Sequence, residues 1–317
     1  MLSSLHKIVN TVLHLPNTSV TNNPLLNKTS IEKLRHLAEK PEDRKPNAHE
    51  VEHRQYGDMR SVYRGYGLDY EESRQYQPGD EIRFMNWRLS ARSDELYMKV
   101  FREERKPSVF ILVDRRQSMR FGSNTRLKVT QAVRAAAYLG FMAKQQNAPV
   151  GGVVLNETAE WIPESSGEAA IYNLLSQINT PCPPLDHENE ISLDHTLRLL
   201  LNMLVRGSVI YLISDFHDLC TASHPVLLQL AEEHKIHAIN IQDSLERKLP
   251  NVSGINIVNP DIDEDIYLGG DSRTQAQFKQ RASAHYHLIQ NSFSQFNIPY
   301  TEIDTDLDEI DTLISRS

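Results

Sequence analysis

One stretch constrains the fold more than any other: residues 108–114, which read S-V-F-I-L-V-D. Five consecutive apolar residues run without alternation into Asp114, which is the pattern of a strand covered on both faces. Residues 208–215, S-V-I-Y-L-I-S-D, repeat this pattern and end at Asp215. In open parallel sheets, the loops after the carboxyl ends of the strands converge on a ligand-binding crevice. The sequence therefore predicts a functional site at the rim that holds both aspartates.

Helical and strand-like segments alternate through the rest of this region. Periodicity predicts helices at 125–146, 168–178, 191–205, 224–233, 272–296 and 307–315, and further strands at 150–155, 236–241 and 299–303, with a hairpin within 255–268. Alternating strands and helices are typical of a doubly wound α/β domain with a mostly parallel sheet. We expect this fold class for residues 108–317.

Changes in composition divide the chain into three parts. Residues 1–50 are expected to form a lead-in that is partly helical or flexible, with one helix at 30–39 before the charged breaker P-E-D-R-K-P. Residues 51–107 alternate tyrosines with charged residues and glycines, which predicts a small β-rich module. The α/β domain follows.

The bulk composition excludes several classes of protein. A formal net charge of -8 argues against general nucleic-acid binding, which needs clustered lysine and arginine. The 2 cysteines have no metal-binding spacing and suggest no disulfide framework. No window approaches the roughly 20 apolar residues that span a bilayer. We therefore expect a soluble protein with a cytoplasmic location.

The two strand-end aspartates suggest a charged site. If their strands are neighbours, we expect the carboxylates of Asp114 and Asp215 to face one another, and such a pair needs a cation, an arginine or a proton between its members. Alternatively, each aspartate caps the helix that follows its strand. His217 lies two residues beyond Asp215, so a magnesium-dependent hydrolase that uses Asp114, Asp215 and His217 is an alternative function. The sequence contains no phosphate-binding glycine motif of the Walker or dinucleotide type.

Two adjacent motifs carry a family resemblance. The run R-Q-Y-Q-P-G-D-E-I-R-F-M-N-W-R-L-S-A-R, followed by V-D-R-R-Q-S-M-R-F-G, resembles the family called domain of unknown function 58, over about residue 57 to the C-terminus. The C-terminal part of that family is related to von Willebrand factor A domains. Its members are typically bacterial and encoded beside a MoxR-type AAA+ ATPase. The resemblance therefore implies a protein partner of that type more than a reaction.

The resemblance also implies candidate metal ligands. In von Willebrand factor A domains a D-x-S-x-S loop, a later threonine or serine and a later aspartate hold Mg²⁺, which captures a carboxylate of the partner. Here Asp114 and Ser118 match the first and last positions of the loop, and Asp215 matches the later acid. Ser192 is the candidate for the intermediate hydroxyl, with Thr196 as the second choice. Mg²⁺ is thus the candidate cofactor, since it prefers oxygen ligands.

The middle serine of that loop is replaced by Arg116, whose guanidinium cannot ligate a cation. Two arrangements follow. Either Arg116 points outward and water replaces the lost ligand, or it bridges Asp114 and Asp215 and does the electrostatic work of the metal itself.

The first motif contributes further candidates. Its positions that match the family are Arg74, Asp80, Arg83, Trp87 and Arg92. These residues form either a partner-binding surface or a set of structural ion pairs around a packed tryptophan. We favour the structural ion pairs. Taken together, the sequence predicts a non-enzymatic interaction protein that docks its partner at the strand-end crevice.

Overall fold

The computed structural model describes residues 23–39, 68–78, 80–93, 95–103, 107–123, 125–182, 190–247, 255–258, 265–268, 272–308 and 310. The chain forms two compact units. The α/β unit comprises Met1–Glu42 with Pro107–Ser317, and the small unit comprises Asp43–Lys106.

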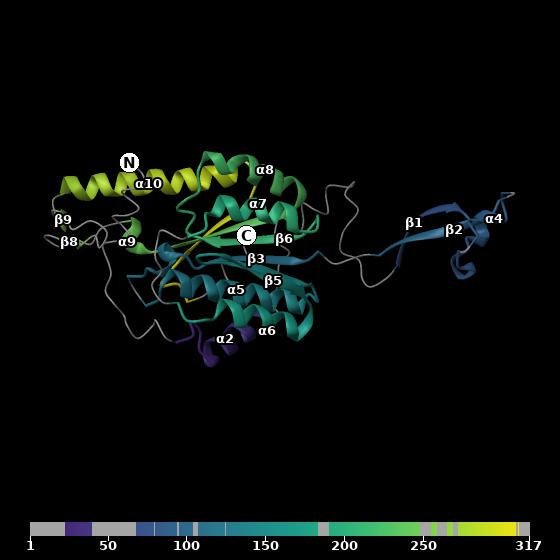
Figure 1. Ribbon diagram of the computed structural model, residues 1–317, viewed down its shortest axis with the longest axis horizontal. Helices are drawn as coiled ribbons and strands as arrows, with labels where there is room; N and C mark the ends of the chain where they lie inside the picture. The colour runs from purple at the N-terminus through teal and green to yellow at the C-terminus, as the bar shows by residue number, and fades with distance from the viewer. Residues whose placement is uncertain are drawn as a thin grey trace. The chain divides into compact units, whose positions relative to one another are not determined.

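A six-stranded sheet organises the α/β unit (Figure 1). The spatial order is β10-β7-β6-β3-β4-β5, and every neighbouring pair is parallel except β4 and β5. The mostly parallel α/β fold predicted from the sequence is therefore confirmed. The strands are β3 (Val109–Asp114), β4 (Val150–Leu155), β5 (Ala159–Ser165), β6 (Val209–Ser214), β7 (Lys235–Gln242) and β10 (Tyr300–Asp304).

Helices cover both faces of this sheet (Figure 1). One face carries α5 (Lys128–Gln145), and the other carries α7 (Leu193–Met203), α8 (His224–Glu233) and α10 (Ser272–Ser294). Alternate residues of β3 supply the two cores: Ile111 packs with the α5 side, and Phe110 and Leu112 pack with the α7 and α8 side. A strand buried on both faces needs apolar residues at every position, which explains the unbroken run.

The edge strand β5 was not predicted. It follows β4 after a short turn and runs antiparallel to it, and most of its side chains are half-buried or exposed. Its mixture of polar and apolar residues gives no strong strand pattern, because only a central strand must be apolar on both faces.

Small residues in α5 allow this helix to pack closely against a neighbouring helix as well as against the sheet. A Cβ on Gly140 would lie 2.6 Å from Leu174 Cδ2 of α6 (Gly167–Ile178). The glycine therefore sets the approach of α5 and α6, which lie side by side below the sheet in Figure 1.

The helix in the lead-in belongs to the α/β unit, which corrects the expectation of a separate segment. Helix α2 (Lys28–Glu39) packs against α5, and Leu34 and Ala38 are buried there. The side chain of Asn179, at the end of α6, binds both backbone groups of Leu26, at 2.6 and 3.0 Å. Patterning predicted the helix, but its docking depends on residues far away in the sequence.

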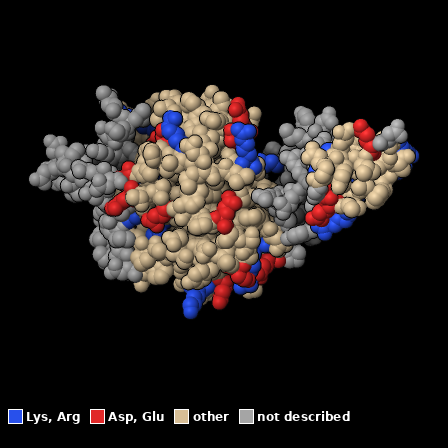
Figure 2. Space-filling view, turned by 45° about the vertical axis from the view of Figure 1, so that its right-hand side comes forward, with Lys and Arg blue, Asp and Glu red and all other residues tan. Residues whose placement is uncertain are grey.

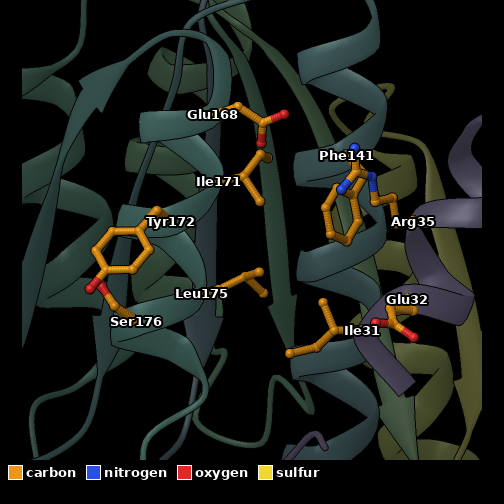
Figure 3. A pocket seen from close by; sticks show the side chains of 9 residues that line it. All are labelled: Ile31, Glu32, Arg35, Phe141, Glu168, Ile171, Tyr172, Leu175 and Ser176. Carbon is orange, nitrogen blue, oxygen red and sulfur yellow. The ribbon is translucent and has the colours of Figure 1, made fainter. Parts of the chain in front are cut away.

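A groove of about 550 Å³ remains between α2, α5 and α6 (Figure 3). Its apolar residues include Ile31, Phe141 and Leu175, and the charged side chains of Arg35 and Glu168 lie at it.

In the small unit, the described residues form an antiparallel pair of strands, β1 (Leu68–Gln75) and β2 (Tyr97–Glu103). The connection between them holds a 3-10 turn, Ile82–Phe84, and a short helix α4 (Trp87–Ser90). The described part of the module thus contains the expected antiparallel strands, with two short helical turns in the connection between them. Its tyrosines before residue 68 lie outside the described residues.

The C-terminal predictions are partly confirmed. Strands β8 (Ile255–Val258) and β9 (Asp265–Leu268) form the expected antiparallel hairpin, and α9 (Ser244–Arg247) precedes them. The closing helix expected at 307–315 lies largely outside the described residues.

The docking of α2 can be tested with Leu34→Ala. Because Leu34 is fully buried, we expect this change to lower the free energy of unfolding by about 2–4 kcal/mol in guanidinium denaturation. The control Lys33→Ala, at an exposed position of the same helix, should change it by less than about 0.5 kcal/mol. Equal effects of the two changes would show that α2 is not part of the folded unit.

Candidate functional site

The candidate site lies where the strand order reverses. β3 has β4 on one side and β6 on the other, so the connections after β3 and β6 lead to opposite halves of the sheet. Such a switch point leaves a crevice at the carboxyl ends of the strands. The register pairs Val113 with Ile213, which places Asp114 beside Ser214.

Asp114 is fully buried and each of its oxygens accepts hydrogen bonds. Ser214 Oγ donates to Oδ2 at 2.6 Å. The guanidinium of Arg116 donates from Nε to Oδ1 at 3.0 Å and from Nη2 to Oδ2 at 2.7 Å, and the Arg116 backbone N–H also reaches Oδ1 at 3.0 Å. This two-pronged pairing is the strongest arrangement for a guanidinium and a carboxylate.

The same guanidinium binds a second carboxylate. Arg116 Nη1 and Nη2 donate to Asp218 at 2.6 and 3.0 Å, and Nη1 also donates to the carbonyl of Ile191 at 3.3 Å. Asp218 in turn accepts from the backbone N–H of Leu193, at the start of α7, at 2.9 Å. Arg116 therefore joins the loops after β3 and β6 to the segment that begins α7.

The charges of this group stabilise each other. Burial alone would lower the pKa of Arg116, but the Asp114 and Asp218 carboxylates raise it well above its usual value. Burial likewise acts to raise the pKa of Asp218, and the hydrogen bonds and charge of Arg116 outweigh this, so that the pKa is lowered. Arg116 is only 2% exposed, and its charge is compensated within the protein.

Asp215 has a different cationic partner. Lys128 Nζ, at the start of α5, lies 2.8 Å from Asp215 Oδ2 and also binds Glu246 of α9. Burial alone would lower the pKa of Lys128, but the two carboxylates raise it. His217 Nδ1 lies 2.9 Å from Asp215 Oδ1.

The two aspartates do not face one another, which corrects that expectation. Asp114 pairs on the α7 side of the sheet, whereas Asp215 pairs with the base of α5 on the other side. Successive side chains of a strand point to opposite faces, and the register puts Asp114 beside Ser214 rather than beside Asp215.

The choice between the two predicted orientations of Arg116 is also settled by the geometry. The side chain turns inward onto Asp114, as one alternative held, but the second carboxylate is Asp218 and not Asp215. The sequence did contain a signal that Asp114 lies beside Ser214 rather than beside Asp215. The two strands can be aligned on Ser108 and Ser208, whose hydroxyls lie 2.9 Å apart, and this alignment matches Asp114 with Ser214.

The candidate hydroxyls have mixed surroundings. Ser118 Oγ is buried and makes no hydrogen bond with any residue that the structure describes. Ser192 caps α7 by accepting from the His195 backbone N–H at 3.2 Å, and Thr196 Oγ1 donates to the Ser192 carbonyl at 3.2 Å. These two hydroxyls thus serve the first turn of α7.

The residues present do not fit Mg²⁺. Arg116 lies where a cation would have to bind between Asp114 and Asp218, and its fixed charge opposes one. Within the described parts of the chain, no cluster of three or more histidine, cysteine or acidic side chains could hold a metal ion. The hydrolase alternative needs Asp114 and Asp215 around one ion, and they pair on opposite faces of the sheet.

Several residues that build the site were not predicted. Arg115 is buried and donates to the carbonyls of Gln177, Thr180 and Pro181 at 3.1, 2.8 and 3.0 Å, so it satisfies the C-terminal end of α6. Lys128, Asp218 and Glu246 lie on separate loops and helices, and no local pattern marks them. For Arg115, the available signal was its place in a pair of consecutive arginines after a buried strand.

The family-motif candidates belong to the small unit. Arg74 and Asp80 form a two-pronged ion pair at 2.8 and 2.7 Å, and Asp80 also accepts from the Gln77 backbone N–H at 2.9 Å. Arg83 pairs with Glu81. These two ion pairs agree with the structural interpretation. Trp87 does not, because its indole is 62% exposed and is not packed.

The surroundings of His217 predict a pH dependence. Burial acts to lower the pKa of this imidazole, but the charge and hydrogen bond of Asp215 outweigh it and raise the pKa. A raised pKa in the folded state means that the ion pair stabilises fully below the unfolded value of about 6.5 and is lost as pH rises through the folded value. The stability advantage of the wild type over His217→Gln should therefore shrink from about pH 5.5 to about pH 9 in urea denaturation. An advantage that grows with pH would contradict this assignment.

Comparison with known proteins gives distant relatives. An uncharacterised protein of Mycobacterium tuberculosis is 26% identical over 255 residues, which cover 80% of this chain and 80% of the relative. Two solved structures each match 67% of this chain at 15% identity. One is the conserved hypothetical protein BatB from Bacteroides thetaiotaomicron, with a TM-score of 0.42 and 96% of that chain covered. The other is an aerotolerance-related membrane protein from Bacteroides fragilis, with a TM-score of 0.41 and 98% of that chain covered.

These comparisons correct one expectation. The cytoplasmic location inferred from composition is contradicted by the description of the Bacteroides fragilis neighbour as a membrane protein, and we withdraw it. Among the helices that the structure describes, none is long and apolar enough to cross a bilayer.

A family match covers most of the chain and both motifs of the sequence. It extends over residues 72–288, from β1 of the small unit to within α10. The chain belongs to the family described as "Protein of unknown function DUF58".

Proposed function

We infer that this chain is a non-enzymatic docking protein that binds a partner at the crevice beyond β3 and β6. Its α/β unit would be a von Willebrand factor A-like domain in which Arg116 replaces the metal ion. The observation that carries this proposal is the single guanidinium bonded to both Asp114 and Asp218 at the switch point of the sheet.

The arrangement suits a binding site better than a reactive one. Arg116 and Asp114 are almost completely buried and saturated with hydrogen bonds, so neither is free to act on a substrate. Their effect is to hold the loops after β3 and β6 in fixed positions. Fixed loops reduce the ordering that a partner must impose, which favours affinity.

The rim above these loops offers the contact surface. Ser192 and His195, in the first turn of α7, and Thr221, before α8, are exposed, and His217 is half-buried. Asp215 raises the pKa of His217 and thereby favours its positive form. A carboxylate of the partner would meet imidazole groups here in place of a metal ion.

For the partner, we propose a MoxR-type AAA+ ATPase, on the strength of the family resemblance given by the two sequence motifs. The mycobacterial relative makes a bacterial origin plausible.

The replacement of the metal can be tested with Arg116→Ser. This change leaves Asp114 buried without its counter-charge, and we expect the free energy of unfolding to fall by about 3–5 kcal/mol. It also restores a hydroxyl between Asp114 and Ser118, so that millimolar Mg²⁺ should raise the melting temperature of the variant, because an ion that binds only the folded form stabilises it. The melting temperature of the wild type should be the same in Mg²⁺ and in EDTA. A Mg²⁺-dependent rise in the wild type would contradict the replacement, whether or not the variant folds.

The docking itself can be tested by binding of the purified chain to a purified MoxR-type AAA+ ATPase from the same organism, measured by biolayer interferometry in EDTA. We expect binding without metal, and at least about tenfold weaker binding for His195→Glu, because like charges at an interface repel. The control is Met203→Glu, an exposed substitution at the other end of α7, which should bind as the wild type does. Equal binding of both variants would exclude the crevice, and no binding of the wild type would exclude the ATPase.

A further inference from the structure

Several large apolar side chains are exposed in the described part of the small unit. Among its described side chains, Met85 and Met98 are the buried hydrophobic ones, whereas Ile82, Trp87, Leu89 and Leu96 are exposed, with Ile82 at 63%. Much of the face of this unit that is visible in Figure 2 carries no charged residue. Exposed apolar side chains that gather in one short segment, as Ile82, Trp87 and Leu89 do, indicate a surface that a partner covers.

The segment that presents Trp87 is held in place by its neighbours. Asn86 caps α4 by accepting from the Leu89 backbone N–H at 3.2 Å, and its own N–H donates to the Tyr97 carbonyl of β2 at 2.7 Å. Its side-chain amide also donates to Ser73 Oγ of β1 at 2.8 Å. The exposure of Trp87 is therefore built into the fold of the small unit, on a pre-formed turn fastened to both of its strands.

Three arginines lie within five residues of Trp87 in the sequence. Arg83 pairs with Glu81 and lies over the ring of Phe84, with 4.6 Å from its guanidinium carbon to the ring centroid. Arg88 and Arg92 are exposed and form no ion pair with any described residue. Backbone hydrogen bonds continue the helical turn from α4 to Arg92, so these two side chains, four positions apart, project from the same side of it.

We propose that this surface, the Trp87 face, binds an acidic protein segment that also carries apolar side chains. The name Trp87 face stands for exposed residues of one short segment, namely Ile82, Arg83, Trp87, Arg88, Leu89 and Arg92. Tryptophan and arginine are the residues that contribute most to protein interfaces, and guanidinium groups match carboxylates in two-pronged pairs. The surface belongs to the small unit, and this proposal does not rest on the proposed function of the strand-end crevice.

The composition favours a protein over a lipid surface. Recognition of anionic membranes typically uses clusters of 4–8 lysines or arginines, or a long amphipathic helix. The Trp87 face has three arginines, one of them already paired, around a helix of 4 residues.

The test uses Trp87 as its own reporter. The chain has 2 tryptophans, so a Trp161→Phe background leaves Trp87 as the only indole. This protein is titrated with a synthetic peptide that intersperses glutamate with leucine, and with a counterpart in which glutamine replaces each glutamate. We expect the glutamate peptide to shift the emission to the blue, to bind at least about tenfold more tightly than the glutamine peptide at low salt, and to lose this preference in high salt.

Matched variants identify the surface. Arg88→Gln combined with Arg92→Gln should abolish the preference for the glutamate peptide, whereas Arg206→Gln, at an exposed arginine of the α/β unit, should leave it unchanged. Equal binding of the two peptides, or a preference that survives in the Arg88 and Arg92 variant, would overturn the proposal. Tighter binding to vesicles of phosphatidylserine and phosphatidylcholine than to the peptide would assign the surface to lipid instead.

Discussion

A single buried ion triad, Asp114–Arg116–Asp218, holds the strand-end rim together. Removing three charges from water is strongly unfavourable, and the interaction is stable only when the geometry is good and the remaining hydrogen-bonding groups are satisfied. Both conditions are met, because Ser214, the Leu193 N–H and the Ile191 carbonyl take up the remaining positions. The loop conformations around the crevice therefore depend on one arginine.

A second cation, Lys128, repeats this solution on the opposite face of the sheet, where it compensates Asp215 and Glu246. Asp114 and Asp215, at the ends of two adjacent parallel strands, point to opposite faces of the sheet. Each carboxylate is neutralised by a basic side chain from a different part of the chain. The switch point thus has charge-paired groups on both faces, and the docking proposal rests on the shape and rim of the crevice rather than on an open charge.

The sequence predicted those parts of the fold that follow from local patterns. Unbroken apolar runs marked β3, β4 and β6, and periodicity marked α5 to α8, because a buried sheet allows few other sequences. The pairing of Arg116 with Asp114 was one of the predicted alternatives, but its second partner, Asp218, and the pairing of Lys128 with Asp215 could not be predicted, since pairing across more than 80 residues leaves no local trace. The divergence of Asp114 and Asp215 was predictable in principle from the equal lengths of the two apolar runs. The exposure of Trp87 could not be predicted, because an aromatic residue in a charged segment can lie in a core or on a surface.

The packing of α2 against α5 has a topological consequence. Helix α2 precedes the small unit in the chain and β3 follows it, yet both belong to the α/β unit, so the small unit is an insertion within a single folded body. Closing a chain loop becomes only slowly more unfavourable with length, by about 0.6 kcal/mol for each doubling. An inserted unit can therefore change in length and sequence with little effect on the body that carries it, which leaves its surface free to diversify.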